Sequence, residues 1–357
     1  MDQSRQMRQE FRAIRATAIC FLVGIGVGTL VLWGNPRPVA GAGSVGIPAA
    51  VVAGVIAAAT FILGTLLRRR VEQAVMPRWQ RIISAGSAAA LTVAFAGVTA
   101  LGVLLASEIL GVALKGLELP PFGGGIVIGI ASAVGGRLAF DAVAGLRTSD
   151  LATLLLGYVV IGTLLAMLTA TDPRWWELNF SQLGVGAGSW AFNGTLVVAG
   201  LLVATVGAYI GRDLHRLRGD SALGRIGAVV VLWSSTGVAL AAVGVLPVHR
   251  GEIAHNVATI STLVLFLAAA ALTTAVMPGP PRMLVLFTIG VCVLLVVAVV
   301  LRDPLRVYSL TVLEVIVVGL GLGWMTVLVR TLSWLAPPDP RPSEREYLLH
   351  RASRAAA

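Results

Sequence analysis

Charged residues are scarce in this chain. Asp, Glu, Lys and Arg make up 12% of its 357 residues, whereas 57% of the residues are hydrophobic. Soluble globular domains carry about twice that share of charge. The apolar residues gather in runs of about 20, the length that an α-helix needs to cross the hydrocarbon layer, and they do not alternate as barrel strands do. The composition therefore excludes a soluble domain and predicts an all-α integral membrane protein.

Cysteine and histidine are also rare, with two and four copies. Cys20 and Cys292 each lie alone in an apolar run, which excludes a disulfide framework and a Cys-x-x-Cys metal site. The stretch "GVGAGS" (Gly184–Ser189) lacks the third glycine of a dinucleotide fingerprint, and Walker, Gly-x-Ser-x-Gly and His-Glu-x-x-His motifs do not occur. We therefore expect no cofactor and no metal, and an ATP-driven pump in one chain is excluded.

Apolar runs between charged residues predict a polytopic bundle of about ten transmembrane helices. The expected spans are Ala16–Trp33, Pro48–Leu67, Ile82–Ser107, Phe122–Gly136, Leu151–Ala170, Trp190–Gly211, Ile226–Leu246, Ile253–Val276, Met283–Leu301 and Ser309–Val329. The fourth run is short and follows a Leu119-Pro120-Pro121 turn, so a complete crossing and a re-entrant segment both stay open for it.

The net charge of +10 comes from short basic clusters between the apolar runs. This placement argues against nucleic-acid binding and follows the positive-inside rule. With a cytoplasmic N-terminus, all but six of the 27 Lys and Arg fall on the cytoplasmic side. The exceptions are Arg37, Lys115, Arg174, Arg250, Arg302 and Arg306. We therefore expect both termini in the cytoplasm and the protein in the cell (plasma) membrane.

The order of the spans predicts three regions. Residues 1–150 form a four-helix membrane region, and residues 151–335 form a six-helix membrane domain. Residues 336–357 are rich in proline and arginine and are expected to form a flexible basic tail. Glycines four residues apart, such as Gly24 and Gly28 or Gly319 and Gly323, allow close helix packing. Packing within the bundle is the favoured interpretation, and a membrane-protein partner on these glycine-rich faces is the alternative.

Three loops of the second half are predicted to lie on the same outer face and to carry most of its polar residues. The candidate ligand-binding residues are Asp172, Arg174, Glu177, Arg250, His255, Asn256, Arg306 and Glu314. Glu314 lies about one and a half turns into the last span. An ionisable group there is a functional candidate, with an ion pair to a loop arginine as the structural alternative.

Two other interpretations of these loops carry less weight. Trp175 and Trp176 are typical of interfacial anchors, because indole rings favour the headgroup level. A zinc site of His249, His255 and Glu314 is disfavoured, because the two histidines are six residues apart and do not form an i, i+4 pair.

From Leu151 to about Leu335 the sequence resembles domain of unknown function family 998, a bacterial membrane family. The likeness is carried by "FSQLG" (Phe180–Gly184), by "FNGTLVVAGLLV" (Phe192–Val203) and by the loop "GVLPVHRGEIAHNVAT" that leads into His255. The resemblance implies a six-helix membrane fold and no agreed activity. Its allied families of autophagy modulators and GPI-lipid remodelling factors imply a connection with lipids.

Three hypotheses about function follow. The favoured one is a protein that binds or moves a lipid or a lipid-linked anion, with Arg174, Arg250 and Arg306 contacting the anion. The second is a non-catalytic scaffold or accessory subunit of an envelope or transport complex. The third is an outward-facing hydrolase or transferase that pairs His255 with Asp172 or Glu177, and it carries the least weight. The catalytic residues of such an enzyme are unknown from the sequence.

Overall fold

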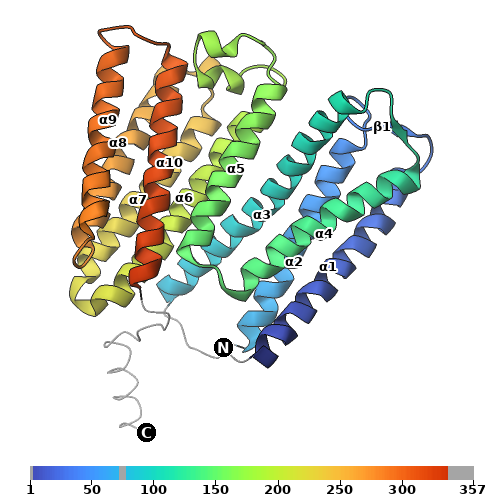
Figure 1. Cartoon of the computed structure of the whole chain (residues 1–357), viewed down its shortest axis with the longest axis horizontal. Helices are drawn as coiled ribbons and strands as arrows, with labels where there is room; N and C mark the ends of the chain where they lie inside the picture. Colours follow the sequence, from blue (N-terminus) through green and yellow to red (C-terminus); the bar gives the residue numbers. More distant parts are fainter. Residues whose placement is uncertain (1–2, 72–77, 337–357) are drawn as a thin grey trace. The chain divides into compact units, whose positions relative to one another are not determined.

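The computed structural model describes residues 3–71 and 78–336, and ten α-helices fill most of that part of the chain (Figure 1). The helices are α1 (Gln3–Val31), α2 (Gly46–Val71), α3 (Arg78–Ala113), α4 (Pro121–Gly145), α5 (Thr148–Leu168), α6 (Ser189–Arg218), α7 (Leu223–Val245), α8 (Glu252–Val276), α9 (Arg282–Arg302) and α10 (Leu310–Leu335). The predicted basic tail lies outside the described residues, apart from Ala336.

Nine helical stretches of the described chain are long and apolar enough to cross a membrane. One of them, Ser189–Val245, is 57 residues long and contains α6, the short 3-10 helix η3 (Gly219–Ala222) and α7. A crossing takes about 20 residues, and a Cβ on Gly200 of α6 would collide with the carbonyl oxygen of Gly237 in α7. This stretch is therefore a hairpin of two helices. The all-α polytopic bundle is confirmed, and the orientation in the membrane stays a prediction.

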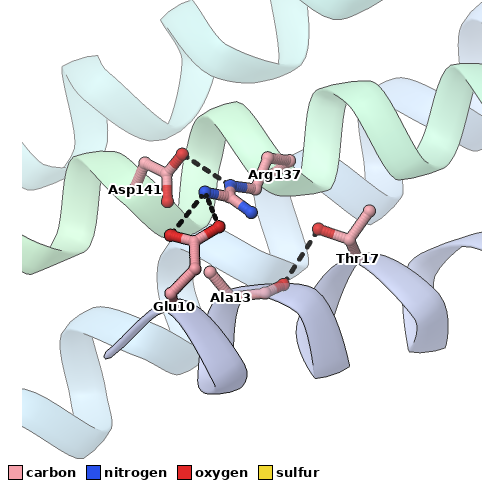
Figure 2. A network of polar contacts seen from close by, with 5 residues as sticks. All are labelled: Glu10, Ala13, Thr17, Arg137 and Asp141. Carbon is pink, nitrogen blue, oxygen red and sulfur yellow. Dashed lines mark hydrogen bonds and ion pairs between the residues drawn. The ribbon is translucent and has the colours of Figure 1, made fainter. Parts of the chain in front are cut away.

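Helix α4 is longer than the fourth apolar run predicted. Its spanning segment extends over 23 residues, Pro121–Val143. Proline at the first helical position suits a helix start because its missing N–H would have no partner there. Arg137 does not end the helix as expected. Its guanidinium pairs with Glu10 of α1 at 3.0 Å and with Asp141 one turn later at 2.7 Å, as Figure 2 shows.

The described residues divide into two compact units. Unit 1 comprises the described residues within Met1–Leu146, together with Gly157–Ala170 and Ala187–Val198. Unit 2 comprises Arg147–Leu156, Thr171–Gly186 and the described residues from Ala199 onward. Helices α5 and α6 thus contribute residues to both units, and each unit is described separately below.

Unit 1 is held by close approach of helix backbones. Helix α4 packs against α1 and α2, and α2 packs against α3. A Cβ on Gly24 of α1 would lie 2.9 Å from the Cα of Gly129 in α4, and a Cβ on Gly129 would lie 3.0 Å from the carbonyl oxygen of Phe21. Gly28 and Gly125 make equally tight contacts with the facing helix. These four glycines therefore serve packing within the unit.

The loops at one end of unit 1 form a small antiparallel ladder that the sequence did not predict. Strands β1 (Arg37–Pro38) and β2 (Glu118–Leu119) pair Arg37 with Leu119 and Pro38 with Glu118. The adjacent core consists of Leu32, Val45, Ala49 and Ile128, all fully buried. The ladder ties the α1–α2 connection to the α3–α4 connection.

Unit 2 is built around an aromatic cluster in which buried Trp233 (α7) and Trp324 (α10) pack with half-buried Phe266 (α8). The Phe266 ring meets both indoles edge-on, with centroids 5.6 and 5.7 Å away, and the two indoles are stacked at 6.5 Å. Each indole N–H donates to a threonine hydroxyl, Trp233 to Thr273 at 3.0 Å and Trp324 to Thr288 at 2.9 Å. Thr288 belongs to α9, so the cluster joins α7 to α10 through four helices.

Asp213 of α6 is a buried carboxylate that the sequence analysis did not single out. Its side chain accepts a hydrogen bond from the Thr148 hydroxyl, and it lies 3.5 Å from Arg212 Nε and from Arg216 Nη1. A buried carboxylate needs such partners to offset its lost hydration. These contacts fix α5 against the C-terminal part of α6 in unit 2.

Candidate functional site

Residues 171–186 form a loop that is fastened to helices α8 and α10, and we call it the clamped loop. In Figure 1 it lies at the end of unit 2 where α10 begins. It contains the 3-10 helices η1 (Trp175–Glu177) and η2 (Phe180–Gly184). At Gly186 the backbone has φ 81° and a Cβ would collide with the Thr171 side chain, so glycine allows the loop to close on its own start.

Two side chains of α10 reach the clamped loop. The Thr311 hydroxyl donates to the carbonyl oxygen of Trp176 at 2.8 Å, and the Glu314 carboxylate accepts the N–H of Phe180 at 2.7 Å. Threonine and glutamate three residues apart on a helix lie on one face, so a single face of α10 satisfies two backbone groups of the loop. Glu314, placed within the last span by the sequence, therefore meets a loop amide and not a loop arginine.

His255 connects the clamped loop with the start of α8. It is 4% exposed, and its Nε2 lies 2.8 Å from the Ser181 hydroxyl. Its Nδ1 donates to the carbonyl oxygen of Leu246, 2.8 Å away, at the C-terminal end of α7. A carbonyl oxygen can only accept, so Nδ1 carries the hydrogen. In the neutral ring Nε2 is then an acceptor, and the Ser181 hydroxyl donates to it.

The remaining candidate residues are exposed. Asp172 turns back to accept the backbone N–H of Arg174 at 2.8 Å. Arg174, Glu177, Arg250, Asn256 and Arg306 are all exposed. Within the described residues they make no side-chain hydrogen bond or ion pair with His255 or Glu314. The structure thus brings His255 and Glu314 to the clamped loop, whereas the three arginines predicted to bind an anion are exposed and do not contact these two side chains.

Ser181 belongs to this site but was not among the ligand-binding residues predicted from the sequence. The sequence offered one signal, its position inside "FSQLG" (Phe180–Gly184), which becomes η2. Nothing in that stretch reveals that its hydroxyl meets a histidine 74 residues later. In the described parts of the chain, no group of three His, Cys, Asp or Glu side chains is arranged to hold a metal ion.

An apolar groove runs between α9 and α10 below this end of unit 2. It has a volume of about 430 Å³. Its lining includes Leu294, Val297, Leu301, Tyr308, Val315 and Gly319. The Tyr308 hydroxyl donates to the carbonyl oxygen of Ala298, so even this polar tip is satisfied within the protein. The groove therefore presents an apolar surface, and the two helices that form it are both long and apolar enough to span a membrane.

Residues 151–331, just over half of the chain, match the family model described as "Protein of unknown function (DUF998)". The chain belongs to the DUF998 family. No curated protein and no solved structure matches it.

The DUF998 region contains every residue of the site described above. The clamped loop, His255, Glu314 and the α9–α10 groove all lie within residues 151–331. Helices α1–α4 precede this region. In this chain the family match therefore covers the polar loop and its helix contacts, whereas the glycine-packed helices α1 and α4 lie outside the matched residues.

Proposed function

We propose that the DUF998 region binds a membrane lipid, with an acyl chain in the α9–α10 groove and an anionic headgroup at the loop end. The observation that carries this proposal is the groove itself. A volume of about 430 Å³ is in the range of ligand sites, and the groove lies between two segments that are each long enough to span a membrane, Arg282–Arg302 and Leu310–Leu335. Because the groove is lined by apolar side chains, a hydrocarbon chain is the occupant that it favours.

Glycine creates the space in this groove. Gly319 lines it, and a Cβ built on Gly319 would meet nothing within 4 Å. A larger side chain at this position would therefore fill the groove without disturbing α10. Gly323, four residues later, also has open space around it but is not part of the lining. The two glycines provide a matched pair for testing occupancy.

The charge at the end of the groove favours an anionic headgroup. Arg302 follows the lining residue Leu301, and its Nε is buried without an acceptor among the described residues, while Nη1 pairs with Asp303 at 3.0 Å. Arg306 is exposed two residues before the lining residue Tyr308. The N-cap residue Ser309 makes no side-chain hydrogen bond to the first turn of α10 in the described structure, so the N–H groups and the positive dipole end of this helix also favour an anion.

The proposal includes a location in the plasma membrane of a bacterial cell, with membrane lipids as the partners. The connection with lipids that the allied families imply supports it in a general way. A docking surface for another membrane protein is the competing function, and the same experiment separates the two.

The test is native mass spectrometry of the full chain extracted in a mild detergent. We expect the wild type and Gly323→Leu to retain lipid, and Gly319→Leu to lose most of it. Arg302→Gln with Arg306→Gln should retain lipid but lose the preference for anionic over zwitterionic species. Equal lipid retention by Gly319→Leu and Gly323→Leu would refute the groove. A chain without lipid but with a stoichiometric protein partner would favour the scaffold.

A further inference from the structure

The pair Ser181 and His255 has the arrangement of a nucleophile and its general base. The Ser181 hydroxyl lies 2.8 Å from His255 Nε2. On the other side of the ring, Nδ1 donates to the carbonyl oxygen of Leu246. An activated serine needs a base in hydrogen-bond reach and a third group that fixes the tautomer of that base. Both conditions are met here, with a backbone carbonyl as the third group.

We propose that Ser181 is the nucleophile of an acyl-transfer site, acting on the carboxylic ester of a membrane lipid. Ser181 is partly exposed and lies outside the spanning segments, between Thr148–Leu168 and Ser189–Val245. It is therefore close to the boundary between hydrocarbon and headgroups, where the ester bonds of glycerolipids lie. That the ester belongs to a lipid rests on the proposed function above, whereas the nucleophile itself does not.

The surroundings of Ser181 hold the hydroxyl in place and leave one polar group open. The N–H of the preceding Phe180 is bonded to Glu314, and the Phe180 ring meets Trp175 edge-on with centroids 5.2 Å apart. Two residues before Ser181, Asn179 Oδ1 is buried and has no hydrogen-bond donor within the described chain. A donor on a bound alcohol or water would satisfy this oxygen. The Glu314 contact thus fixes this turn on α10, while Asn179 Oδ1 is left to accept a hydrogen bond from a ligand.

The reaction balances with these groups and one acyl acceptor. Ser181 Oγ forms a bond to the ester carbonyl carbon while its proton passes to His255 Nε2. The bond from that carbon to the alcohol oxygen then breaks, and the proton moves from Nε2 to the leaving alcohol. Water or a second alcohol attacks the acyl-serine, gives its proton to Nε2, and releases the acid or the new ester as Ser181 is reprotonated. Among the described residues no carboxylate is bonded to the His255 ring nitrogens, and the carbonyl oxygen of Leu246 takes the place of the partner predicted at Asp172 or Glu177.

The test is labelling of the purified full chain in detergent with a fluorophosphonate probe, followed by peptide mapping. We expect covalent modification at Ser181, complete loss in Ser181→Ala, and at least a 100-fold slower reaction in His255→Gln, the lower range for removing a general base. Ser221→Ala, which alters an exposed hydroxyl bonded to Arg218, should label like the wild type.

Two results would overturn the proposal. The first is a folded wild type, verified by its unfolding midpoint, that does not react at Ser181. The second is labelling of Ser181 at the same rate in His255→Gln. Because the probe needs no lipid, labelling that persists in Gly319→Leu would support the nucleophile even if the groove proposal failed. Lipid retention by Ser181→Ala would show that the variant loses labelling without losing the ability to bind lipid.

Discussion

Units 1 and 2 are both bundles of apolar helices, yet different forces hold them. In unit 1, α1 and α4 meet along glycines, with a Gly24 Cβ position 2.9 Å from the Cα of Gly129. In unit 2, the tryptophans Trp233 and Trp324 fill the core and bond to threonines on neighbouring helices. Backbone contact needs the absence of side chains, whereas the aromatic cluster needs particular side chains in particular orientations.

This difference in packing shows which of the two units has room for a functional site. Tight glycine contacts leave little room between α1 and α4, and the ion pairs of Arg137 with Glu10 and Asp141 in Figure 2 are exposed. Unit 2 fixes its helices with bulky side chains, leaves a groove between α9 and α10, and gathers buried polar groups at the clamped loop. The residues that match the family, 151–331, contain both the groove and the clamped loop.

The largest expected effect comes from adding a methyl group to the glycine contact of unit 1. In Gly24→Ala the new Cβ would lie 2.7 Å from Ser132 Oγ and 2.9 Å from the Cα of Gly129, so α1 and α4 must move apart. Overpacking of this kind costs about 1–3 kcal/mol. The measurement is the thermal unfolding midpoint of each variant in detergent micelles.

Gly26→Ala is the matched control, because a Cβ at this exposed position of α1 meets nothing within 4 Å. Alanine favours a helix over glycine by up to about 1 kcal/mol, so Gly26→Ala should equal or exceed the stability of the wild type. Equal midpoints for Gly24→Ala and Gly26→Ala would show that the glycine contact is not what holds these helices.

A somewhat smaller effect is expected from Trp233→Phe in unit 2. Phenylalanine loses the hydrogen bond to Thr273 and leaves part of a fully buried site unfilled. Hydrogen bonds between membrane helices average about 0.6 kcal/mol, and with the lost packing we expect about 1–2 kcal/mol in denaturant unfolding. Trp334→Phe, at an 89% exposed position, is the control and should be neutral. The aromatic cluster would lose its assigned role if both variants behaved alike.

The smallest effect is expected from Arg137→Gln. Its ion pairs with Glu10 and Asp141 are exposed, with 58% and 52% of the carboxylate side chains accessible. Exposed ion pairs contribute little and are screened by salt. We expect a shift of the midpoint smaller than in Gly24→Ala that shrinks further when the ionic strength is raised. A large, salt-independent shift would show that this network, and not the glycines, dominates unit 1.

Much of the architecture follows from the sequence alone. Lengths of apolar runs between charges predicted ten helices, because crossing hydrocarbon imposes a length on each one. The weak point was the fourth run, where Arg137 looked like the end of a span. A long side chain near a helix end can direct its charge to water and to partners while the helix continues, and no local pattern reveals that Glu10 is such a partner.

The site was only partly predictable. His255 and Glu314 stood out because ionisable groups are rare inside spans. Their partners, Ser181 and the amide of Phe180, lie in a loop whose path depends on two 3-10 helices and on the turn at Gly186. Such contacts arise from tertiary structure, 74 residues apart for Ser181 and His255 and 134 for Phe180 and Glu314. The ligand-binding role of the exposed arginines stays a prediction.

The central claim is that α8 and α10 hold the clamped loop, and hydrogen exchange at the Phe180 amide tests it most directly. In the wild type this N–H donates to Glu314 at 2.7 Å, so exchange of the peptide around it should be slow. Glu314→Ala should speed exchange at Phe180 several-fold, whereas Glu252→Ala, at an exposed carboxylate of α8, should not. Exchange in the wild type as fast as in an unfolded peptide, or unchanged by Glu314→Ala, would contradict the clamp and the site built on it.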